Sequence, residues 1–238
     1  MKFEGKKIVV TGAASGIGQA QANAFLQQGA EVFGIDIEKA TINHENYTHF
    51  TGSVADQSFI KSTIAQLATV DILCNTAGVL DGYAKSLETD MALWDRIFTI
   101  NVKGMYIVTN AVLKKMLEKK QGIIVNMASI AGMIAGGGGA AYTASKHAVI
   151  GYTKQLSYDY CKEGIRVNGI APGAIETAMN AADFEGDGEM AKWVAKETPA
   201  GRWAKAEEVA NVTLFLASKE SDYMHATIIP IDGGWINK

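Results

Sequence analysis

Tyr142 and Lys146 are the pair of residues in this chain best suited to move a proton. They lie four positions apart, so on a helix their side chains share one face. A free tyrosine phenol has a pKa of about 10 and is a weak base near neutral pH. A lysine ammonium beside it favours the phenolate, lowers that pKa and lets the phenol accept or donate a proton. Because this spacing is common on helices, the pair alone does not indicate a site.

Ser129 strengthens the interpretation. It follows the apolar segment 123–127 and lies upstream of Tyr142, where its hydroxyl can hold a substrate oxygen at the phenol. Asn101 is the fourth polar residue that we assign to the same machinery. The predicted catalytic set is therefore Asn101, Ser129, Tyr142 and Lys146.

The segment Thr11–Gly18 carries glycines in a pattern suited to a phosphate. Gly12, Gly16 and Gly18 follow a predicted strand and open a predicted helix, with Ser15 and Ile17 among them. Glycines permit a tight turn and let backbone N–H groups approach a pyrophosphate, which the helix N-terminus also attracts. The segment predicts a dinucleotide site; an ordinary glycine-rich turn is the alternative.

Asp36 bears on which dinucleotide is bound. It ends the second predicted strand, where a carboxylate can accept hydrogen bonds from the adenosine ribose. The extra phosphate of NADP would face this carboxylate, and at ~4 Å with an effective dielectric constant of ~20 each like-charge pair costs up to ~4 kcal/mol. No Lys or Arg stands in the glycine turn, and Ile37 follows Asp36. We therefore predict NAD rather than NADP, against the alternative that Asp36 is a solvated strand end.

The overall charge gives no general affinity for nucleic acid or an anionic membrane, since the net charge is −3 and no long basic run occurs. The longest uncharged stretch, Gln121–Ser145, contains Asn126, Tyr142 and several glycines, so we do not expect it to span a membrane. Met1–Lys7 leads directly into a predicted strand, and we expect no secretory signal.

Cysteine and histidine patterns indicate no metal site. Cys74 and Cys161 lack metal-ligand spacing and are expected to be reduced, packed thiols of a cytoplasmic protein. The four histidines also lack ligand spacing and are expected to be structural or surface residues: His44, His49, His147 and His225.

Strands and helices alternate along the chain with short connections. Strands are predicted over 7–10, 31–35, 70–74, 122–127, 165–170 and 227–231. Helices are predicted over 16–28, from Asp56 through Leu67, and over 91–119, 142–163 and 206–217. The segment 177–202 is predicted to be irregular and placed to act as a substrate lid.

Continuous apolar strands that alternate with helices predict an α/β fold: a Rossmann-like, doubly wound parallel sheet flanked by helices on both faces. We expect residues 1–238 to form a single domain, since no linker or internal repeat occurs. Ligands of such sheets bind beyond the carboxyl ends of the strands, and the residues named above fall at or just after those ends.

These motifs together resemble the short-chain dehydrogenase/reductase family, in its compact single-domain branch, over essentially the whole chain. The family's glycine motif matches Thr11–Gly18, and its Asn-Ala-Gly element matches residues 75–78. The catalytic asparagine matches Asn101, and the serine, tyrosine and lysine match Ser129, Tyr142 and Lys146. The segment 172–177 and the ending 232–235 are also similar.

The resemblance implies hydride transfer between a nicotinamide cofactor and a secondary alcohol or ketone, without a metal. The positive charge of the oxidised nicotinamide would then add to that of the Lys146 ammonium in lowering the pKa of Tyr142. It implies that Lys146 also holds the nicotinamide ribose and that Asn101 anchors a water that relays protons. The residues expected to bind the cofactor are Gly12, Ser15, Gly16, Ile17, Gly18, Asp36, Ser53, Val54, Asn75, Ala77, Gly78, Tyr142, Lys146, Pro172, Gly173, Ile175 and Thr177.

Two departures from the family pattern concern the cofactor. Thr76 stands where the family usually has a second asparagine, which we expect to alter local hydrogen bonding only. Ser53-Val54 replaces the usual Asp-Val pair at the adenine, and a serine hydroxyl binds less strongly than a carboxylate.

The substrate is less well defined. Gly136–Gly139 supplies almost no side chain, and the predicted lid offers Met179, Phe184, Met190 and Trp193 as apolar contacts or as packing residues. The lid carries no arginine suited to bind a substrate carboxylate, although Arg202 at its end could reach into the substrate site. Besides the favoured dehydrogenase, a 3-oxoacyl-carrier-protein reductase and a non-catalytic dinucleotide sensor remain as alternatives.

The helices over 91–119 and 142–163 carry apolar residues on more than one face, which predicts a protein partner. On the first helix these residues are Ile100, Met105, Ile107, Val108 and Val112. In the family, equivalent helices pair between subunits, so a homotetramer is expected, with a dimer as the second choice.

Overall fold

Seven parallel strands form the central sheet in the computed structural model, which describes residues 1–238. Their order across the sheet is β3–β2–β1–β4–β5–β6–β9. The strands are β1 (Lys7–Thr11), β2 (Glu31–Asp36), β3 (Tyr47–Thr51), β4 (Ile72–Asn75), β5 (Gly122–Met127), β6 (Ile165–Pro172) and β9 (Ile228–Ile231). A two-residue pair, β7 (Ile175–Glu176) and β8 (Ala204–Lys205), lies outside the sheet. The sheet class predicted from the sequence is confirmed.

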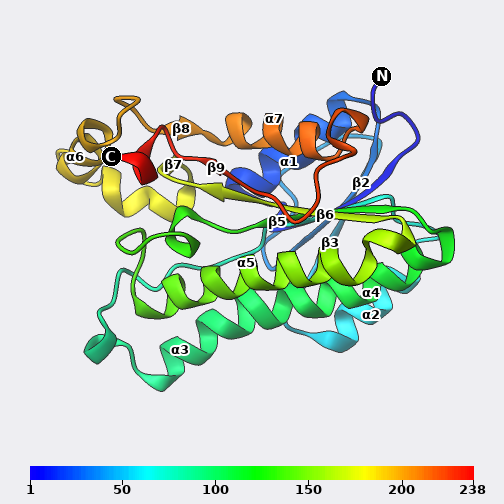
Figure 1. The fold of residues 1–238 in the computed structure, drawn as a ribbon, viewed down its shortest axis with the longest axis horizontal. Helices are drawn as coiled ribbons and strands as arrows, with labels where there is room; N and C mark the ends of the chain where they lie inside the picture. The colour runs from blue at the N-terminus through cyan, green and yellow to red at the C-terminus, as the bar shows by residue number, and fades with distance from the viewer.

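Helices cover both faces of this sheet (Figure 1). They are α1 (Gly16–Gln27), α2 (Gln57–Ala65), α3 (Met91–Phe98), α4 (Met105–Lys119), α5 (Ala140–Tyr160), α6 (Glu189–Glu197) and α7 (Ala206–Leu216). In Figure 1, α1 and α7 lie together above the sheet, and α2 to α5 lie below it, while α6 stands apart at one end.

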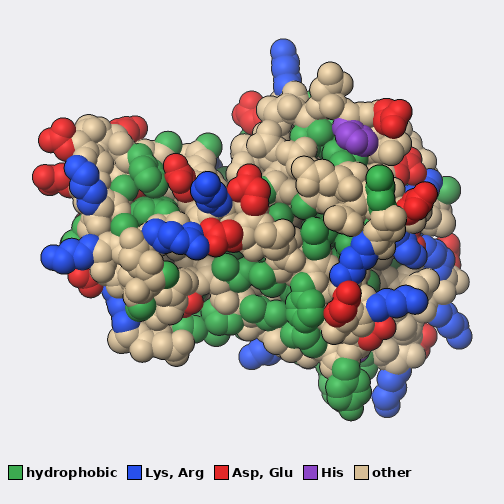
Figure 2. All heavy atoms as spheres, turned by 90° about the horizontal axis from the view of Figure 1, so that it is seen from above, with side chains coloured by type: hydrophobic (Ala, Val, Ile, Leu, Met, Phe, Trp, Pro, Cys, Tyr) green, Lys and Arg blue, Asp and Glu red, His purple; other side chains and the backbone are tan.

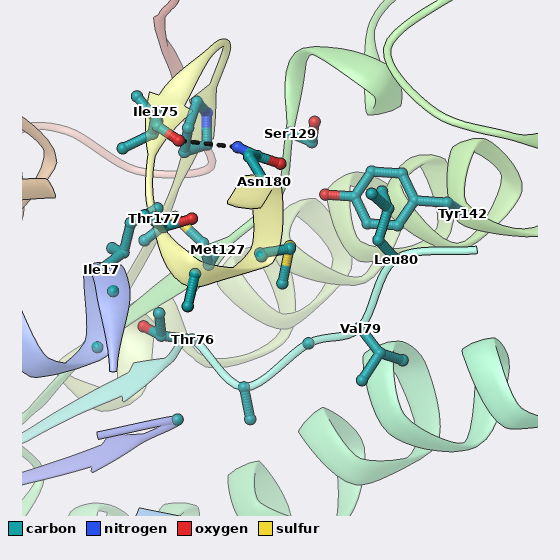
Figure 3. A pocket seen from close by; sticks show the side chains of 18 of the residues that line it. Ile17, Thr76, Val79, Leu80, Met127, Ser129, Tyr142, Ile175, Thr177 and Asn180 are labelled. Carbon is teal, nitrogen blue, oxygen red and sulfur yellow. Dashed lines mark hydrogen bonds between the residues drawn. The ribbon is translucent and has the colours of Figure 1, made fainter. Parts of the chain in front are cut away.

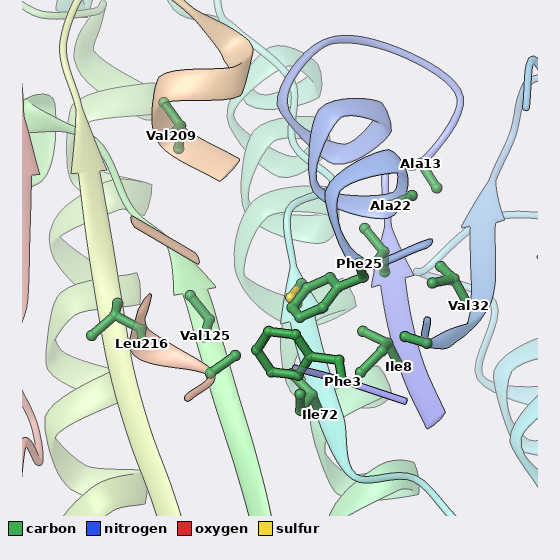
Figure 4. Close-up of a cluster of buried hydrophobic side chains, with 14 of the residues drawn as sticks. Phe3, Ile8, Ala13, Ala22, Phe25, Val32, Ile72, Val125, Val209 and Leu216 are labelled. Atoms are coloured by element: carbon green, nitrogen blue, oxygen red, sulfur yellow. The ribbon is translucent and has the colours of Figure 1, made fainter. Parts of the chain in front are cut away.

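Successive side chains along each strand point to opposite faces of the sheet, and this divides the hydrophobic core into two main clusters. Ile8 and Val10 of β1 belong to a cluster with Phe25 of α1, part of which Figure 4 shows. Val9 points to the other side and joins a cluster with Val108 and other residues of α4. This two-sided burial is what the continuous apolar strands predict. It fixes the strands and leaves their carboxyl ends free to form a site.

Strand order reverses between β1 and β4. The chain proceeds outward from β1 through β2 to β3, and then returns to place β4 on the other side of β1. A crevice is expected where two neighbouring connections leave in opposite directions. The glycine turn after β1 and the segment after β4 flank this point.

The sequence did not predict β3. Its residues Tyr47–Thr51 are half-buried or exposed, because this strand lies at the sheet edge, and they lack an apolar run. Other strand boundaries differ from the prediction by one or two residues: β4 begins at Ile72 rather than at residue 70, and β6 continues to Pro172.

The helix predicted over 91–119 contains an unexpected interruption. Residues Thr99–Gly104 form a π-helical segment between α3 and α4. The predicted lid is also more regular than expected: Ala178–Phe184 forms a short helical segment, and α6 occupies residues 189–197.

The five apolar residues expected to face a partner are mostly used within the subunit. Met105, Val108 and Val112 are buried in the core, and Ile100 and Ile107 are half-buried. Exposed apolar side chains on these helices are instead Met91, Tyr106 and Tyr158. None of the helices combines the length and the apolarity needed to cross a membrane.

Candidate active site

A cavity of about 730 Å³ lies beyond the carboxyl ends of β1, β2, β4 and β5. Its lining comes from the glycine turn, the segments after these strands, the start of α5 and the predicted lid. In the space-filling view, hydrophobic side chains gather in the hollow between the lobe at the left and the body (Figure 2). The cavity is large enough for a dinucleotide and a small substrate.

The glycine turn forms a cradle that a larger residue would fill. Gly12 has a φ of +71°, and a Cβ there would meet the backbone of Ala77 at 3.0 Å. Gly16 has a φ of +52° and faces Thr177, while a Cβ on Gly18 would collide with the carbonyl of Gly12. Bare backbone is therefore required at this turn.

The N-terminus of α1 opens on this cradle. Ser15 makes no side-chain cap, and the first turn carries no acidic residue. The first N–H groups of the helix thus keep their hydrogen-bonding capacity for an anion. Gly12, Ser15, Gly16, Ile17 and Gly18 all line the cavity, which fits the pyrophosphate of a dinucleotide.

Asp36 lies at the expected adenosine end of the cavity. Its carboxylate accepts hydrogen bonds from the backbone N–H groups of Ala14 at 2.9 Å and Glu38 at 3.0 Å. Ser53 and Val54 line the same end. The Ser53 hydroxyl accepts a hydrogen bond from the N–H of Ala55.

Tyr142, Lys146 and Ser129 converge in the middle of the cavity, as predicted. Tyr142 and Lys146 lie on one face of α5, with the ammonium 5.5 Å from the centre of the phenol ring. Ser129 follows β5, and its hydroxyl and that of Tyr142 point into the same space (Figure 3). The Lys146 ammonium donates a hydrogen bond to the carbonyl of Met127 at 2.9 Å.

Burial controls the protonation of this pair. It raises the pKa of Tyr142 to about 12, with hydrogen bonding by Ser129 acting against it. It lowers the pKa of Lys146 to about 8. In the protein without cofactor, desolvation is the largest effect on the phenol pKa, and the carboxylate of Asp81 contributes to the increase. The predicted lowering, which also depends on the positive charge of a bound oxidised nicotinamide, stays a prediction.

Asn101 lies in the π-helical segment and does not line the cavity. Its carboxamide donates hydrogen bonds to the carbonyl of Val79 at 3.0 Å and the hydroxyl of Ser145 at 3.2 Å. Its oxygen accepts one from the N–H of Val79 at 2.8 Å. Asn101 thus ties the segment after β4 to α5, directly beside Gly78 and Lys146.

Asn75 is buried behind the cavity wall rather than in it. Its amide donates to the side chains of Thr109 and Asn126, both at 2.9 Å. Its oxygen has no hydrogen-bond partner. The expectation that Asn75 contacts the cofactor is not supported, because its side chain holds β4 to its neighbours. Ala77 and Gly78 do line the cavity.

Thr76, which stands where the family usually has a second asparagine, takes part in a chain of side-chain hydrogen bonds. Its hydroxyl donates to the amide oxygen of Gln21, and Gln21 in turn donates to Thr213 at 2.8 Å. The N–H groups of Thr76 and Ala77 both donate to the hydroxyl of Thr11. The Thr76 hydroxyl therefore connects this segment to α1.

The segment after β6 closes the cavity opposite the glycine turn. Pro172, Gly173, Ile175 and Thr177 all line it. A Cβ on Gly173 would meet Asp232 at 2.9 Å, so this glycine allows the C-terminal segment to approach. The contact of these residues with the nicotinamide stays a prediction.

The predicted lid contributes to the lining in part. Met179, Met190 and Trp193 line the cavity. Phe184 does not, and packs on Trp203 with ring centres 4.9 Å apart. Arg202 does not reach in either, because its guanidinium pairs with Glu208 at 2.7 and 2.8 Å.

Sequence reasoning missed several residues of the site. The cavity is also lined by Trp203, Asn180 and Asp183, which belong to no motif. It is lined as well by Trp235, which ends the family-like segment 232–235 but was not assigned to the site. Asp81 was also missed. It is buried beneath α5, where its carboxylate accepts from the N–H groups of Gly139 and Tyr142. An aspartate before a glycine is usual in turns, so only the fold shows this contact.

A dinucleotide cradle beside a buried serine, tyrosine and lysine defines an oxidoreductase that uses a nicotinamide cofactor. The family model described as Enoyl-(Acyl carrier protein) reductase matches residues 12–236. The chain belongs to the short-chain dehydrogenase/reductase family. It is an enzyme of the kind that transfers a hydride between NAD(P)(H) and an alcohol or ketone.

Two curated relatives span the whole chain. Dehydrogenase/reductase SDR family member 6 of Rattus norvegicus is 38% identical over 242 residues, covering 98% of each chain. The 3-oxoacyl-[acyl-carrier-protein] reductase FabG of Thermotoga maritima is 37% identical over 251 residues, covering 99% of this chain and 100% of that protein.

A solved structure shares the fold closely. The gluconate 5-dehydrogenase of Burkholderia cenocepacia, in complex with NADP and tartrate, superposes with a TM-score of 0.90 at 29% identity. The match covers 100% of this chain and 97% of that one.

Proposed function

We propose that this protein is an NAD(H)-dependent dehydrogenase or reductase of a secondary alcohol or ketone, with Tyr142 as the general acid and base. The observation that carries the proposal is the convergence of Ser129, Tyr142 and Lys146 in the same cavity as the glycine cradle. A binding protein without catalysis would need the cradle but not these three side chains.

The cofactor would lie along the cavity, with its pyrophosphate at the glycine turn and its nicotinamide beside Ile175 and Thr177. When bound, it supplies the carbon that gives or takes the hydride. The tightness of the turn supports this arrangement, since Gly12 and Gly18 leave no space for side chains.

The protein's own residues would manage the proton. With a pKa of about 12, Tyr142 is protonated at neutral pH and can donate its proton to the oxygen of a ketone. Ser129 would hold that oxygen by a hydrogen bond. Lys146 has a pKa of about 8 and can return a proton to the phenol. Asn101 would fix the position of Tyr142 and Lys146 relative to the segment after β4, because its hydrogen bonds hold Val79 beside α5.

NAD rather than NADP is favoured by the charges at the adenosine end. Asp36 and Glu38 line it, with Ile37 between them, and no Lys or Arg side chain does. An added phosphate there would face two carboxylates without a cation. The NADP in the gluconate 5-dehydrogenase belongs to that protein, so the preference has to be measured on this one.

Tyr142→Phe tests the proposal. We expect this variant to bind NADH as tightly as the wild type in calorimetry and to lose about 10²–10⁴-fold in kcat, because only the proton donor is removed. Tyr160→Phe, at the far end of α5 and outside the cavity, is the matched control and should retain full turnover. Undiminished turnover in Tyr142→Phe would exclude the assigned role.

The 37% identity with a 3-oxoacyl-carrier-protein reductase supports a second candidate within the same class. Such an enzyme should prefer NADPH and a carrier-bound 3-oxoacyl substrate. Comparing both cofactors and both substrate types, through the absorbance of the reduced nicotinamide, separates the two candidates.

We further propose a homotetramer that acts in the cytoplasm. Exposed Met91, Tyr106 and Tyr158 on α3 to α5 offer an apolar surface for subunit contact, and both cysteines are free thiols. Light scattering coupled to size exclusion would give the subunit number, and Tyr106→Glu should lower it.

A further inference from the structure

One wall of the cavity is built mainly from apolar side chains of the lid, of the residue that follows it and of the C-terminal segment, with one carboxylate among them. We call it the lid wall; it consists of Met179, Asp183, Met190, Trp193, Trp203 and Trp235. Met179, Met190 and Trp193 are each about half exposed, at 47%, 53% and 53%. Large apolar side chains left this open inside a concave site indicate that an apolar ligand covers them.

The rings of this wall are held in place before any ligand arrives. The indole N–H of Trp203 donates a hydrogen bond to the carbonyl of Ala191 at 2.9 Å, which fixes α6 against the body. Trp193 and Trp235 meet edge to face with ring centres 6.4 Å apart. Edge-to-face contacts stabilise such aromatic pairs beyond their burial. The wall therefore presents a preformed apolar surface.

No cation on this wall could pair with a carboxylate. Among all the residues that line the cavity, Lys146 is the one with a basic side chain. Its ammonium donates a hydrogen bond to the carbonyl of Met127. Arg202 is held outside by Glu208. The charged group of the lid wall is Asp183, which would repel an anionic substrate. An unpaired carboxylate taken from water into such a site loses hydration without compensation.

Apart from Lys146, the polar groups near the expected reaction centre are hydroxyls and an amide. The amide of Asn180 donates a hydrogen bond to the carbonyl of Ile175 at 2.8 Å, and this side chain lies across the space from Ser129 and Tyr142 (Figure 3). Hydroxyl and amide groups can orient a neutral carbonyl or hydroxyl. They cannot neutralise a carboxylate.

We propose that the substrate is an uncharged ketone or secondary alcohol with an apolar, ring-sized body, and that sugar acids are excluded. This inference rests on the proposed function. It separates the chain from the gluconate 5-dehydrogenase with the same fold, whose structure contains tartrate.

Three matched cyclohexane probes test the proposal in the reduction direction. They are cyclohexanone, methyl 4-oxocyclohexanecarboxylate and the free acid 4-oxocyclohexanecarboxylate, each assayed with NADH and with NADPH. We expect kcat/KM for the ester to exceed that for the acid by at least tenfold. An acid turned over as well as its ester would overturn the inference.

A sugar-acid probe distinguishes failure of this inference from failure of the proposed function. Turnover of 5-keto-D-gluconate together with inactivity toward the cyclohexanones would reject the apolar substrate while leaving hydride transfer intact. Inactivity toward every ketone in the panel would reject both.

Asp183→Asn tests the charge argument within the lid wall. We expect it to raise the ratio of kcat/KM for the acid to that for the ester at least threefold, because a like charge is removed. Asp187→Asn removes the same charge from the same segment at a residue outside the cavity, and should leave the ratio at the wild-type value. An unchanged ratio in Asp183→Asn would reject the role of this carboxylate.

Discussion

The carboxylate of Asp81 accepts a hydrogen bond from the backbone N–H of Tyr142 at 2.8 Å. Its other oxygen accepts from the N–H of Gly139 at 2.9 Å. Asp81 is only 4% exposed, so these bonds are shielded from water. A buried negative charge thus satisfies free N–H groups at the start of α5 and sets the position from which the phenol extends.

Asp81→Asn should therefore affect both stability and catalysis. We expect a loss of about 1.5–3 kcal/mol in the free energy of unfolding. The amide oxygen would replace one charge-assisted hydrogen bond by a neutral one, and the amide NH2 group would face the other backbone N–H without an acceptor. Removing the negative charge should also lower the pKa of Tyr142 and shift the pH profile of alcohol oxidation to lower pH. Denaturant titration and kcat against pH measure the two effects.

Asp90→Ala is the control for Asp81. Asp90 caps α3 through the N–H of Leu93 at 2.8 Å and is exposed. Loss of this cap should cost about 0.5–2 kcal/mol without moving the pH profile. If both variants shift the profile equally, Asp81 has only a structural role.

Gly138 is a position where a methyl group should disable the site. A Cβ there would overlap the ring of Tyr142, so Gly138→Ala must displace the phenol. We expect kcat to fall by at least tenfold while NADH binding is retained. Gly151→Ala is the control, because that glycine lies in α5 facing open space; it should keep activity and stabilise the protein by about 0.5–1 kcal/mol.

Lys146 should make stability depend on pH. Burial lowers the pKa of Lys146 from 10.5 to about 8. Between these pH values the unfolded chain binds more protons at this residue than the folded protein does. The free energy of unfolding therefore increases as the pH rises, because the folded protein no longer has to bury an ammonium. Lys146→Met should be more stable than the wild type at neutral pH, by up to about 3 kcal/mol. This difference in the free energy of unfolding should decrease steadily as the pH rises from about 8 to about 10. Urea titrations of both proteins at several pH values check it, and a constant difference would contradict it.

Asp36→Asn should weaken discrimination against NADP. The amide can still accept the hydrogen bond from the N–H of Ala14, while the like charge facing a 2′-phosphate is removed. We expect the ratio of kcat/KM for NADH to that for NADPH to fall at least tenfold, which corresponds to ~1.4 kcal/mol. Glu31→Gln, at the opposite end of β2, removes the same charge and should leave the ratio unchanged.

The sequence predicted those parts of the site whose chemistry is local. The glycine turn is specified by residues 12–18 alone, and the Tyr142–Lys146 pair needs only one helix. Their meeting with Ser129 followed from the rule that ligands bind at the carboxyl ends of parallel strands.

Other features depend on packing that short patterns do not encode. Asn75 belongs to a family motif, yet its amide bonds Thr109 and Asn126 from elements far along the chain. Trp235 reaches the cavity only because the C-terminal segment folds back against α6. The raised pKa of Tyr142 in the protein without cofactor comes from burial, which depends on the whole fold and not on the Tyr142–Lys146 spacing.

The π-helical segment Thr99–Gly104 couples the position of Asn101 to the direction in which the side chains of α4 point. Each residue of an α-helix advances the side-chain direction by about 100°. Deleting one residue from this segment would therefore turn Val108 and Val112 away from the sheet, besides moving Asn101. A loop can lose a residue without such a change, but here length itself is constrained. The position of the Asn101 amide and the burial of α4 both depend on the number of residues in this segment.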